Sequence, residues 1–169
     1  HNQLSDILNH AVNMYGLKDN VARKAGTIGK EENKEMEFWT QEEFQAFLEC
    51  VADKPISYYA FEMLYWTGIR EGELLALTPA DFNFEKKTLR INKSYQRLEG
   101  KDVITDPKTP KSNRTIVMPD FLAVEMEDFI SSLYGIRDDD RIFTISKSYL
   151  HHEMDRGCLL YTSDAADDK

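Results

Sequence analysis

Apolar residues recur every three to four positions over most of the chain, the spacing that places them on one face of a helix. Gly16 is positioned to cap the first such segment, whose apolar face consists of Leu4, Ile7, Leu8, Ala11, Val12 and Tyr15. The sequence then becomes polar and of mixed charge up to Glu37, which is typical of a linker. We therefore expect the end of one small domain in residues 1–24, a linker at 25–37 and a main domain that begins at Phe38.

The main domain begins with a strong helix signal. Thr40 and Glu43 have the spacing of a capping box, and Trp39 and Phe44 have the spacing of a hydrophobic staple at the same helix end. The apolar periodicity that follows predicts a helix from Asp120 and further helices over 41–51, 57–67, 71–78 and 147–155. We expect the aromatic residues of these helices to form the core.

Between the helix at 71–78 and the helix that begins at Asp120, the spacing of apolar residues changes from helical to alternating. The alternation predicts three short strands, which include Leu89–Ile91, Val103–Thr105 and Thr115–Met118. They should form a small antiparallel three-stranded sheet, with a loop at 106–113 between the second and third strands. The predicted fold class is therefore α+β and mainly helical.

The net charge of −9 and the pI near 4.9 argue against nucleic acid as a partner, because phosphate binding calls for basic residues. The charge is unevenly distributed, however. Between Glu85 and Arg114 the chain carries nine Lys and Arg against four Asp and Glu, a local net charge of +5. This segment is either a solvated basic face or a surface on which an acidic protein docks DNA.

Composition limits the remaining chemistry. Cys50 and Cys158 lie far apart and lack metal-ligand spacing, so they indicate neither a zinc site nor a disulfide framework. Three consecutive aspartates at 138–140 are most simply a solvated turn. We expect no metal and no cofactor. A signal-peptide pattern and a long apolar run are both missing, so we expect a soluble, cytoplasmic protein without membrane partners.

The most informative chemistry lies in a glycine-flanked turn at 67–72. Arg70 precedes a short helix there, and Glu73 follows three residues later. A guanidinium presents a planar fork of donors that suits two phosphate oxygens, and a Glu at i+3 can brace it. An ordinary ion pair at a helix end explains these two residues equally well. Lys108, between two prolines of the loop at 106–113, is either a solvated lysine or one presented to a ligand.

An Arg-x-x-Glu turn followed by a basic hairpin resembles the tyrosine recombinases, the phage-integrase family. The resemblance extends to about Gly157 and is to integrases of bacterial integrative elements. It rests on Phe38-Trp39-Thr40, the segment 67–74, Lys93-Ser94-Tyr95, the segment 105–109, Ser112-Asn113-Arg114 and the segment 147–150. It implies that residues 38–157 are the N-terminal part of an integrase catalytic domain and that residues 1–24 end a core-binding domain.

The resemblance also implies roles for individual residues. Arg70 matches the first catalytic arginine, Glu73 its supporting carboxylate, and Lys108 the lysine that protonates the departing 5′-oxygen. The residues expected to contact DNA are Lys93, Arg97, Lys111, Ser112 and Arg114. Members of this family cut and rejoin double-stranded attachment sites through a 3′-phosphotyrosine, without metal or nucleotide, and usually act as tetramers to integrate or excise a mobile element.

The sequence departs from the family beyond its first motifs. The second motif of the family, His-x-x-Arg, has no match, because Arg156 follows His151 and His152 at the wrong spacing. The His-Glu-x-x-His motif of zinc peptidases is missing as well. We expect both histidines to be ordinary surface residues of a helix. Tyr161 lacks the motifs that precede the family's nucleophile.

Tyr161 also belongs to a segment, residues 158–169, that resembles a translated sequencing-library adapter. We hypothesise that this segment is an artefact and that the domain is truncated, so that the chain itself is inactive. A truncated domain should expose apolar faces of Phe61, Leu64 and Leu75. Two alternatives remain: a non-catalytic DNA-binding module, which a missing nucleophile would permit, and a helical interaction domain, which only the acidic charge favours.

Overall fold

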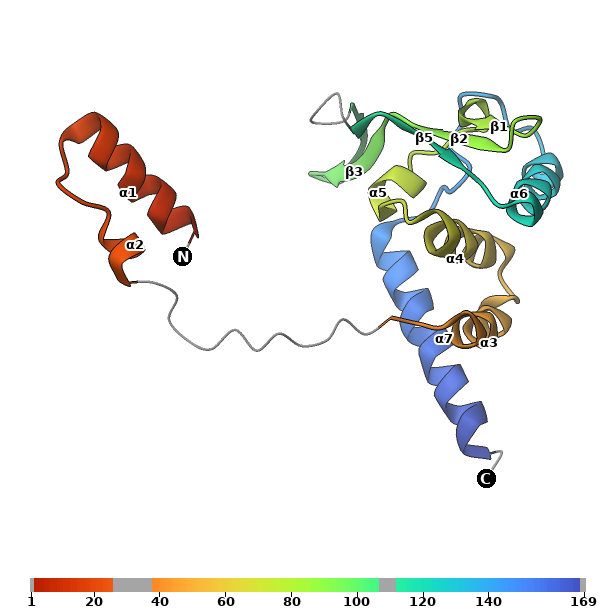
Figure 1. The fold of residues 1–169 in the computed structure, drawn as a ribbon. Helices are drawn as coiled ribbons and strands as arrows, with labels where there is room; N and C mark the ends of the chain where they lie inside the picture. Colours follow the sequence, from red (N-terminus) through yellow and green to blue (C-terminus); the bar gives the residue numbers. More distant parts are fainter. Residues whose placement is uncertain (1, 26–37, 107–111, 168–169) are drawn as a thin grey trace. The chain divides into compact units, whose positions relative to one another are not determined.

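The computed structural model describes residues 2–25, 38–106 and 112–167, and for 162–167 the backbone alone. The chain divides into two compact units, His1–Phe38 and Trp39–Lys169 (Figure 1). Most of the predicted linker, residues 26–37, lies outside the described residues. Among the helices that the structure describes, none is long and apolar enough to cross a bilayer.

The first unit contains α1 (Asn2–Tyr15) and α2 (Val21–Ala25). α1 ends at Gly16, which adopts a φ of +69°. The Asn20 side chain joins the two helices, because its amide donates to the Ser5 carbonyl at 2.8 Å and its oxygen accepts from the backbone of α2. The apolar face of α1 is largely exposed, at 66% for Ile7 and 80% for Tyr15, so the described part of this unit has little core of its own.

The helices of the second unit begin close to their predicted positions, but α5 is shorter than the predicted 71–78 and α7 is longer than the predicted 147–155. They are α3 (Gln41–Val51), α4 (Pro55–Thr67), α5 (Glu71–Leu74), α6 (Asp120–Ser132) and α7 (Lys147–Asp167), with a 3₁₀ turn η1 (Pro79–Asp81) after α5. The capping box is present: Thr40 N–H donates to the Glu43 carboxylate at 2.8 Å, and Glu43 N–H donates to the Thr40 hydroxyl at 3.3 Å. The Trp39 ring packs against Phe47, one turn beyond Phe44.

The strands differ from the prediction in how they pair. β1 (Phe82–Asn83), β2 (Thr88–Ile91) and β5 (Arg114–Val117) form an antiparallel three-stranded sheet in the order β1-β2-β5. β3 (Ser94–Leu98) and β4 (Lys101–Thr105) form a separate two-stranded hairpin. The predicted membership of the sheet is therefore wrong, because the strand at 101–105 pairs with β3 and not with β2 or β5. Glu99 and Gly100 both adopt positive φ in the turn, and this geometry fixes the hairpin.

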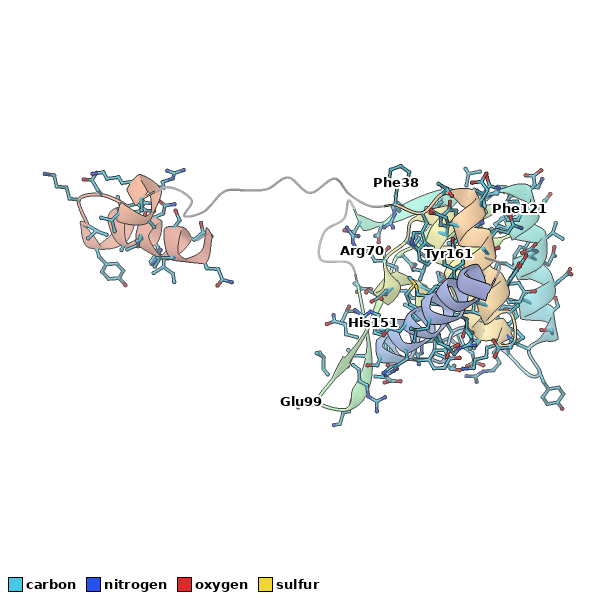
Figure 2. The ribbon with its side chains drawn as sticks, turned by 90° about the horizontal axis from the view of Figure 1, so that it is seen from below. Phe38, Arg70, Glu99, Phe121, His151 and Tyr161 are labelled. Atoms are coloured by element: carbon cyan, nitrogen blue, oxygen red, sulfur yellow. The ribbon has the colours of Figure 1, made fainter. Side chains whose placement is uncertain are left out.

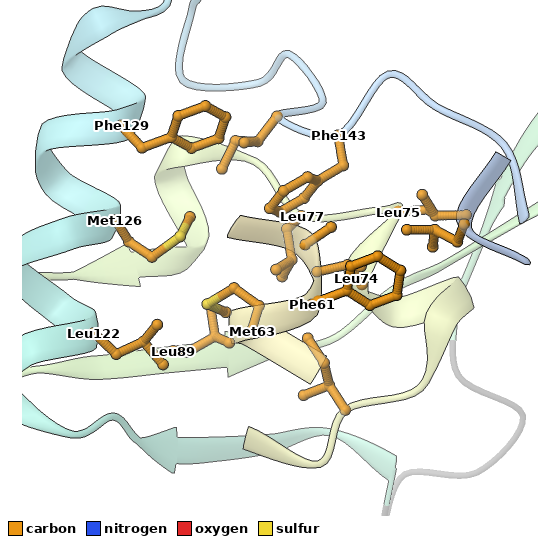
Figure 3. Close-up of a cluster of buried hydrophobic side chains, with 14 of the residues drawn as sticks. Phe61, Met63, Leu74, Leu75, Leu77, Leu89, Leu122, Met126, Phe129 and Phe143 are labelled. Carbon is orange, nitrogen blue, oxygen red and sulfur yellow. The ribbon is translucent and has the colours of Figure 1, made fainter. Parts of the chain in front are cut away.

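The core lies where α4, α5, β2 and α6 meet, and Figure 3 shows a cluster of its buried side chains. The fully buried members include Met63, Leu74, Leu75, Leu77, Leu89, Leu122, Met126 and Phe143. Phe61 and Leu75 are 4% and 0% exposed, so the expectation that they form an open apolar face is wrong, while Leu64 is partly exposed. Phe61 and Leu75 belong to the buried cluster, which the described helices already cover.

α7 packs along α3 and extends beyond its predicted end at residue 155. Gly157 lies at the crossing, where a Cβ would be 2.3 Å from Cε2 of Phe47 and 2.9 Å from Cγ1 of Val51. Glycine is thus required for the two helices to approach this closely. Next to it, Arg156 donates to the Asp53 carboxylate at 2.8 Å and to the Cys50 carbonyl at 3.3 Å, which joins α7 to the end of α3.

Candidate active site

Arg70 stands immediately before α5, where Gly68 ends α4 with a φ of +63°. Its backbone N–H donates to Oε2 of Glu73 at 2.9 Å, and its Nη1 donates to Oε1 of the same carboxylate at 3.2 Å. The Arg70 side chain is nevertheless 77% exposed. One nitrogen of the guanidinium is therefore anchored, while its remaining donors face solvent. Figure 2 labels Arg70 at the edge of its domain.

Glu73 holds a second arginine as well. Nη1 and Nη2 of Arg114, at the start of β5, donate to the two Glu73 oxygens at 2.9 and 2.7 Å, a bidentate ion pair. The Glu73 side chain is only 8% exposed. Hydrogen bonds from Arg114, together with those from Arg70, outweigh the effect of burial and lower the pKa of Glu73 to about 2. The carboxylate is thus charged at every physiological pH, and it links α5 to the sheet.

A pocket of about 400 Å³ opens beside this trio. Its walls come from α5, the β3–β4 hairpin and both described ends of the 106–113 loop, and they comprise Arg70, Glu73, Lys93, Ser94, Gln96, Thr105, Asp106 and Ser112. The structure therefore brings Arg70, Glu73, Lys93 and Ser112 of the predicted site together. Lys108 and Lys111 lie outside the described residues, although Lys108 follows the pocket residue Asp106 by two positions in the sequence.

The residues predicted to contact DNA differ in exposure and in how closely their charged groups are already paired. Lys93 is 22% exposed, and its ammonium forms an ion pair with Asp81 and donates to the Thr78 hydroxyl at 3.2 Å. Arg97, on the outer part of β3, is 60% exposed, and its guanidinium lies 4.0 Å from the Asp102 carboxylate. Arg97 can therefore reach a ligand without breaking a close contact. Lys93, in contrast, joins the η1 turn to the segment between β2 and β3.

Gly72 flanks the Arg70 turn in the sequence, and the structure shows that it also determines how closely α5 approaches β3. A Cβ at this position would lie 2.6 Å from Oγ of Ser94 and 3.1 Å from the Tyr95 carbonyl oxygen. The residue between Arg70 and Glu73 on this turn must therefore be small. A glycine in the second position of a four-residue helix is the signal that could have indicated such close packing.

His151 and His152 lie on α7, and both are exposed, as predicted. Nε2 of His151 lies 2.7 Å from Oε1 of Glu71, the residue that follows Arg70. This contact joins the start of α7 to α5 and borders a separate groove lined by Leu64, Leu150 and Met154. In the described part of the chain, no group of three or more His, Cys, Asp or Glu side chains could hold a metal ion.

No protein-family model matches the chain. Two curated proteins resemble it in sequence. ICEBs1 integrase of Bacillus subtilis (strain 168) is 35% identical over 118 residues, which are 67% of this chain and 31% of that protein. A XerC-like tyrosine recombinase of Caldanaerobacter subterraneus subsp. tengcongensis is 30% identical over 135 residues, 72% of this chain and 34% of that protein. The chain thus spans about a third of the length of these relatives.

Solved structures share the fold. The integrase of the Tn1549 transposon, solved with a circular intermediate DNA, matches with a TM-score of 0.66 over 85% of this chain and 48% of that chain, at 18% identity. XerA recombinase matches with a TM-score of 0.54 over 78% of this chain and 44% of that chain, at 16% identity. The fold is therefore that of a tyrosine recombinase catalytic domain. Together with the sequence relatives, it confirms that the chain belongs to the tyrosine recombinase family.

Proposed function

We propose that this chain carries the first half of the active site of a site-specific DNA recombinase, an integrase of a bacterial mobile element. The observation that supports this proposal best is the exposed Arg70 guanidinium, braced on a buried carboxylate at the wall of a pocket. The names of the relatives support it as well, because they are an integrase and a tyrosine recombinase. The Tn1549 integrase was solved in a complex with DNA.

The charges around Arg70 suit a phosphate. Glu73 alone would repel an anion, but the bidentate pair with Arg114 neutralises it, so the three side chains together carry one net positive charge. That charge is concentrated on Arg70, whose unused donors face the pocket and solvent. We infer that these donors hold a nonbridging oxygen of the scissile phosphate and stabilise the negative charge that grows there during transfer.

The proposed reaction exchanges one phosphodiester for another and needs no external oxidant or nucleotide. A tyrosine oxygen forms a bond to phosphorus as the bond from phosphorus to the 5′-oxygen breaks, which leaves a 3′-phosphotyrosine. Lys108 would donate the proton that the leaving 5′-oxygen takes up, a role that typically contributes about 10²–10⁴-fold. Attack by the 5′-hydroxyl of a partner strand reverses the step and joins the new ends.

This chain should bind DNA without cleaving it. Its 169 residues contain no His-x-x-Arg motif. Tyr161 lies ten residues beyond His151 on α7, roughly 15 Å along the helix axis from the end that contacts α5. We therefore propose that neither Tyr161 nor another residue of this chain is the nucleophile. The missing motif is also what favours the second candidate, a non-catalytic DNA-binding module.

We further propose that the partners are double-stranded attachment sites and, for the intact recombinase, other copies of the protein in a tetrameric assembly in the bacterial cytoplasm. The exposed Arg97 would follow the phosphate backbone, together with Lys111, Ser112 and Arg114 of the predicted DNA-contacting set. Such binding should be weak and sensitive to salt, because phosphate contacts release counterions.

A suicide substrate tests the proposal. A nicked duplex that carries the attachment site of the encoding element traps any covalent intermediate, and fluorescence anisotropy of the same duplex measures binding. We expect the chain to bind with an affinity that falls as salt rises and to yield no covalent product. Covalent product would show that this chain already contains a nucleophile. Binding that is insensitive to salt would contradict the proposed phosphate contacts.

A further inference from the structure

A second pocket, of about 330 Å³, lies on the other side of β3 from the pocket beside Arg70. Successive side chains of a strand point to opposite faces. Ser94 and Gln96 of β3 line the Arg70 pocket. Tyr95 and Arg97, which alternate with them, line the second pocket. The β3–β4 hairpin therefore stands between two pockets, each of which can receive a ligand group.

Arg141, in the segment between α6 and α7, is the fixed cation of this second pocket. Its guanidinium lies over the Tyr95 ring, 4.2 Å from the centroid, and its side chain is only 20% exposed. Nη1 donates to the Leu75 carbonyl at 3.2 Å, and Nη2 donates to the Asp102 carboxylate at 3.3 Å. A guanidinium has five N–H donors, so these contacts of the described structure leave most of them unused. Arg141 is thus held in place with donors to spare.

Arg97 is the exposed cation of the same pocket. Its side chain is 60% exposed, and its Nη1 lies 4.0 Å from Oδ1 of Asp102, too far for a hydrogen bond. That oxygen accepts instead from the Tyr95 hydroxyl at 2.8 Å. Two arginines against one aspartate give the pocket a net charge of +1. The trio around Glu73 has the same composition, with one arginine closely paired and the other largely exposed.

Hydroxyl groups and a third cation complete the surroundings of the pocket. Thr144 and Ser146 line it. The Ser146 oxygen accepts from the Tyr149 N–H at 3.1 Å, so its own proton can be donated to a ligand. Lys147 follows, and its Nζ lies 3.9 Å from the position that a Cβ on Gly72 would take, beside the α5 turn. Positive charge therefore continues from the α5 turn to the second pocket.

We propose that this pocket binds a second phosphate of the DNA backbone, an inference that rests on the proposed function. Arginine forks and hydroxyl groups are common donors to DNA phosphates. A phosphodiester carries one negative charge, which matches the net charge of the pocket. Figure 2 labels Arg70, His151 of α7 and Glu99 at the hairpin tip along one edge of the domain, so a DNA strand that follows this edge runs past both pockets.

Two phosphate sites would divide the work of binding. Arg141 is rigid and lies on the far side of the hairpin from Arg70, so it fixes where the duplex lies, as phosphate contacts do in other complexes. Arg97 closes on the same phosphate from the exposed side. Arg70 is then left to act on the scissile phosphate, at a distance along the strand that the hairpin sets.

Phosphate-ethylation interference tests the site. The folded chain is mixed with an attachment-site duplex that is ethylated at random, one phosphate per molecule, and the bound and free DNA are separated to show which phosphates binding requires. We expect Arg97→Ala and Arg141→Met to lose the interference at one and the same phosphate, and Arg70→Ala to lose it at a different one. Arg141→Met keeps an apolar stem against Tyr95, and Asp102 is 50% exposed, so the variant should fold.

Anisotropy on the same duplex adds magnitudes. Arg97→Ala and Arg141→Met should each weaken binding about tenfold, because each loses hydrogen bonds to a charged group. The double variant should weaken it by less than the product of the two effects, since both side chains contact one phosphate. Arg137→Ala removes the same charge from an exposed turn of the same segment and should change neither affinity nor interference.

Thr144→Val provides the comparison should Arg141→Met fail to fold, because Thr144 is exposed, and it should weaken the interference at the phosphate that Arg97→Ala loses. Loss at two different phosphates, or at none, for Arg97→Ala and Arg141→Met would overturn the proposal. A chain that binds no duplex would overturn the proposed function and this inference together. An Arg70→Ala protein that keeps every interference of the wild type would contradict the proposed function alone.

Discussion

Glu73 and Arg114 are 41 residues apart in the sequence, yet the Arg114 guanidinium donates to both Glu73 oxygens at 2.9 and 2.7 Å. The same carboxylate accepts from the backbone and side chain of Arg70. A single buried acid thus positions one arginine from the helical part of the domain and one from the sheet. The arrangement leaves Arg70 as the exposed member, and this exposure carries the functional proposal.

Arg114→Ala should destabilise the fold as well as weaken DNA binding. It leaves the Glu73 carboxylate, 8% exposed, with Arg70 as its remaining cation. Because Arg114 is itself 33% exposed, we expect a loss of about 2 kcal/mol in the free energy of unfolding, below the range for fully buried pairs. Urea denaturation measures this loss. Arg137→Ala, which removes an ion pair at an exposed turn, is the control and should change stability little.

Glu73 should also make stability depend on acid pH. Its pKa is lowered from 4.5 to about 2 in the folded chain, so its contribution is complete above pH 4.5 and is lost as the pH falls toward 2. The linkage amounts to about 3 kcal/mol. Denaturation of wild type and Glu73→Gln at a series of pH values measures it, and we expect the stability difference to shrink across this window. The exposed Glu42→Gln should show no such trend, and a constant difference for Glu73→Gln would contradict the assignment.

Gly157→Ala tests whether α7 crosses α3 at this residue. In an exposed helix interior the change from glycine to alanine stabilises by up to about 1 kcal/mol. Here the added Cβ would meet the Phe47 ring at 2.3 Å, and overpacking of this kind costs about 1–3 kcal/mol. Thermal unfolding should therefore show a lower Tm for Gly157→Ala. Phe47→Leu in the same chain should restore part of the loss, and a raised Tm for the single variant would mean that the helices do not cross there.

Lys93 and Arg97 should separate stability from DNA binding. Arg97→Ala removes an exposed cation and should reduce the slope of log affinity against log salt by about one, with little effect on folding. Lys93→Ala leaves the buried Asp81 without its closest cation and should lower stability by roughly 1–3 kcal/mol. Anisotropy and urea denaturation of both variants provide the comparison. The opposite pattern would reverse the two roles.

The helices of the main domain could be predicted closely because local signals define them. The helix at 41–51 begins at a capping box and continues with Phe44, Phe47, Leu48 and Val51 at helical spacing, and the structure has the same bounds. The loop at 106–113 was likewise bounded correctly by β4 and β5. Such features depend on neighbours in the sequence, which periodicity and turn chemistry report directly.

Features that depend on distant residues could not be predicted. β3 has only two apolar residues, Tyr95 and Leu98, so its alternation is weak, and its pairing with β4 follows from turn geometry. The sequence placed Arg114 among DNA contacts and gave no sign that it faces Glu73. Lys93 was expected to contact DNA from its place in the basic segment and in the family motif, whereas in the structure its ammonium contacts Asp81 and Thr78. Charge patterns identify where cations gather, and only tertiary contacts decide which of them remain free.

Covalent trapping tests whether Arg70 holds the scissile phosphate of a recombinase. The gene should first be resequenced across the codons for 157–169, and the protein that it encodes should be assayed on the nicked suicide substrate with and without Arg70→Ala. We expect the wild-type protein to form a covalent DNA adduct, and the variant to bind the duplex yet form the adduct at least about 100-fold more slowly. Adduct formation by Arg70→Ala at the wild-type rate would show that Arg70 does not hold the scissile phosphate.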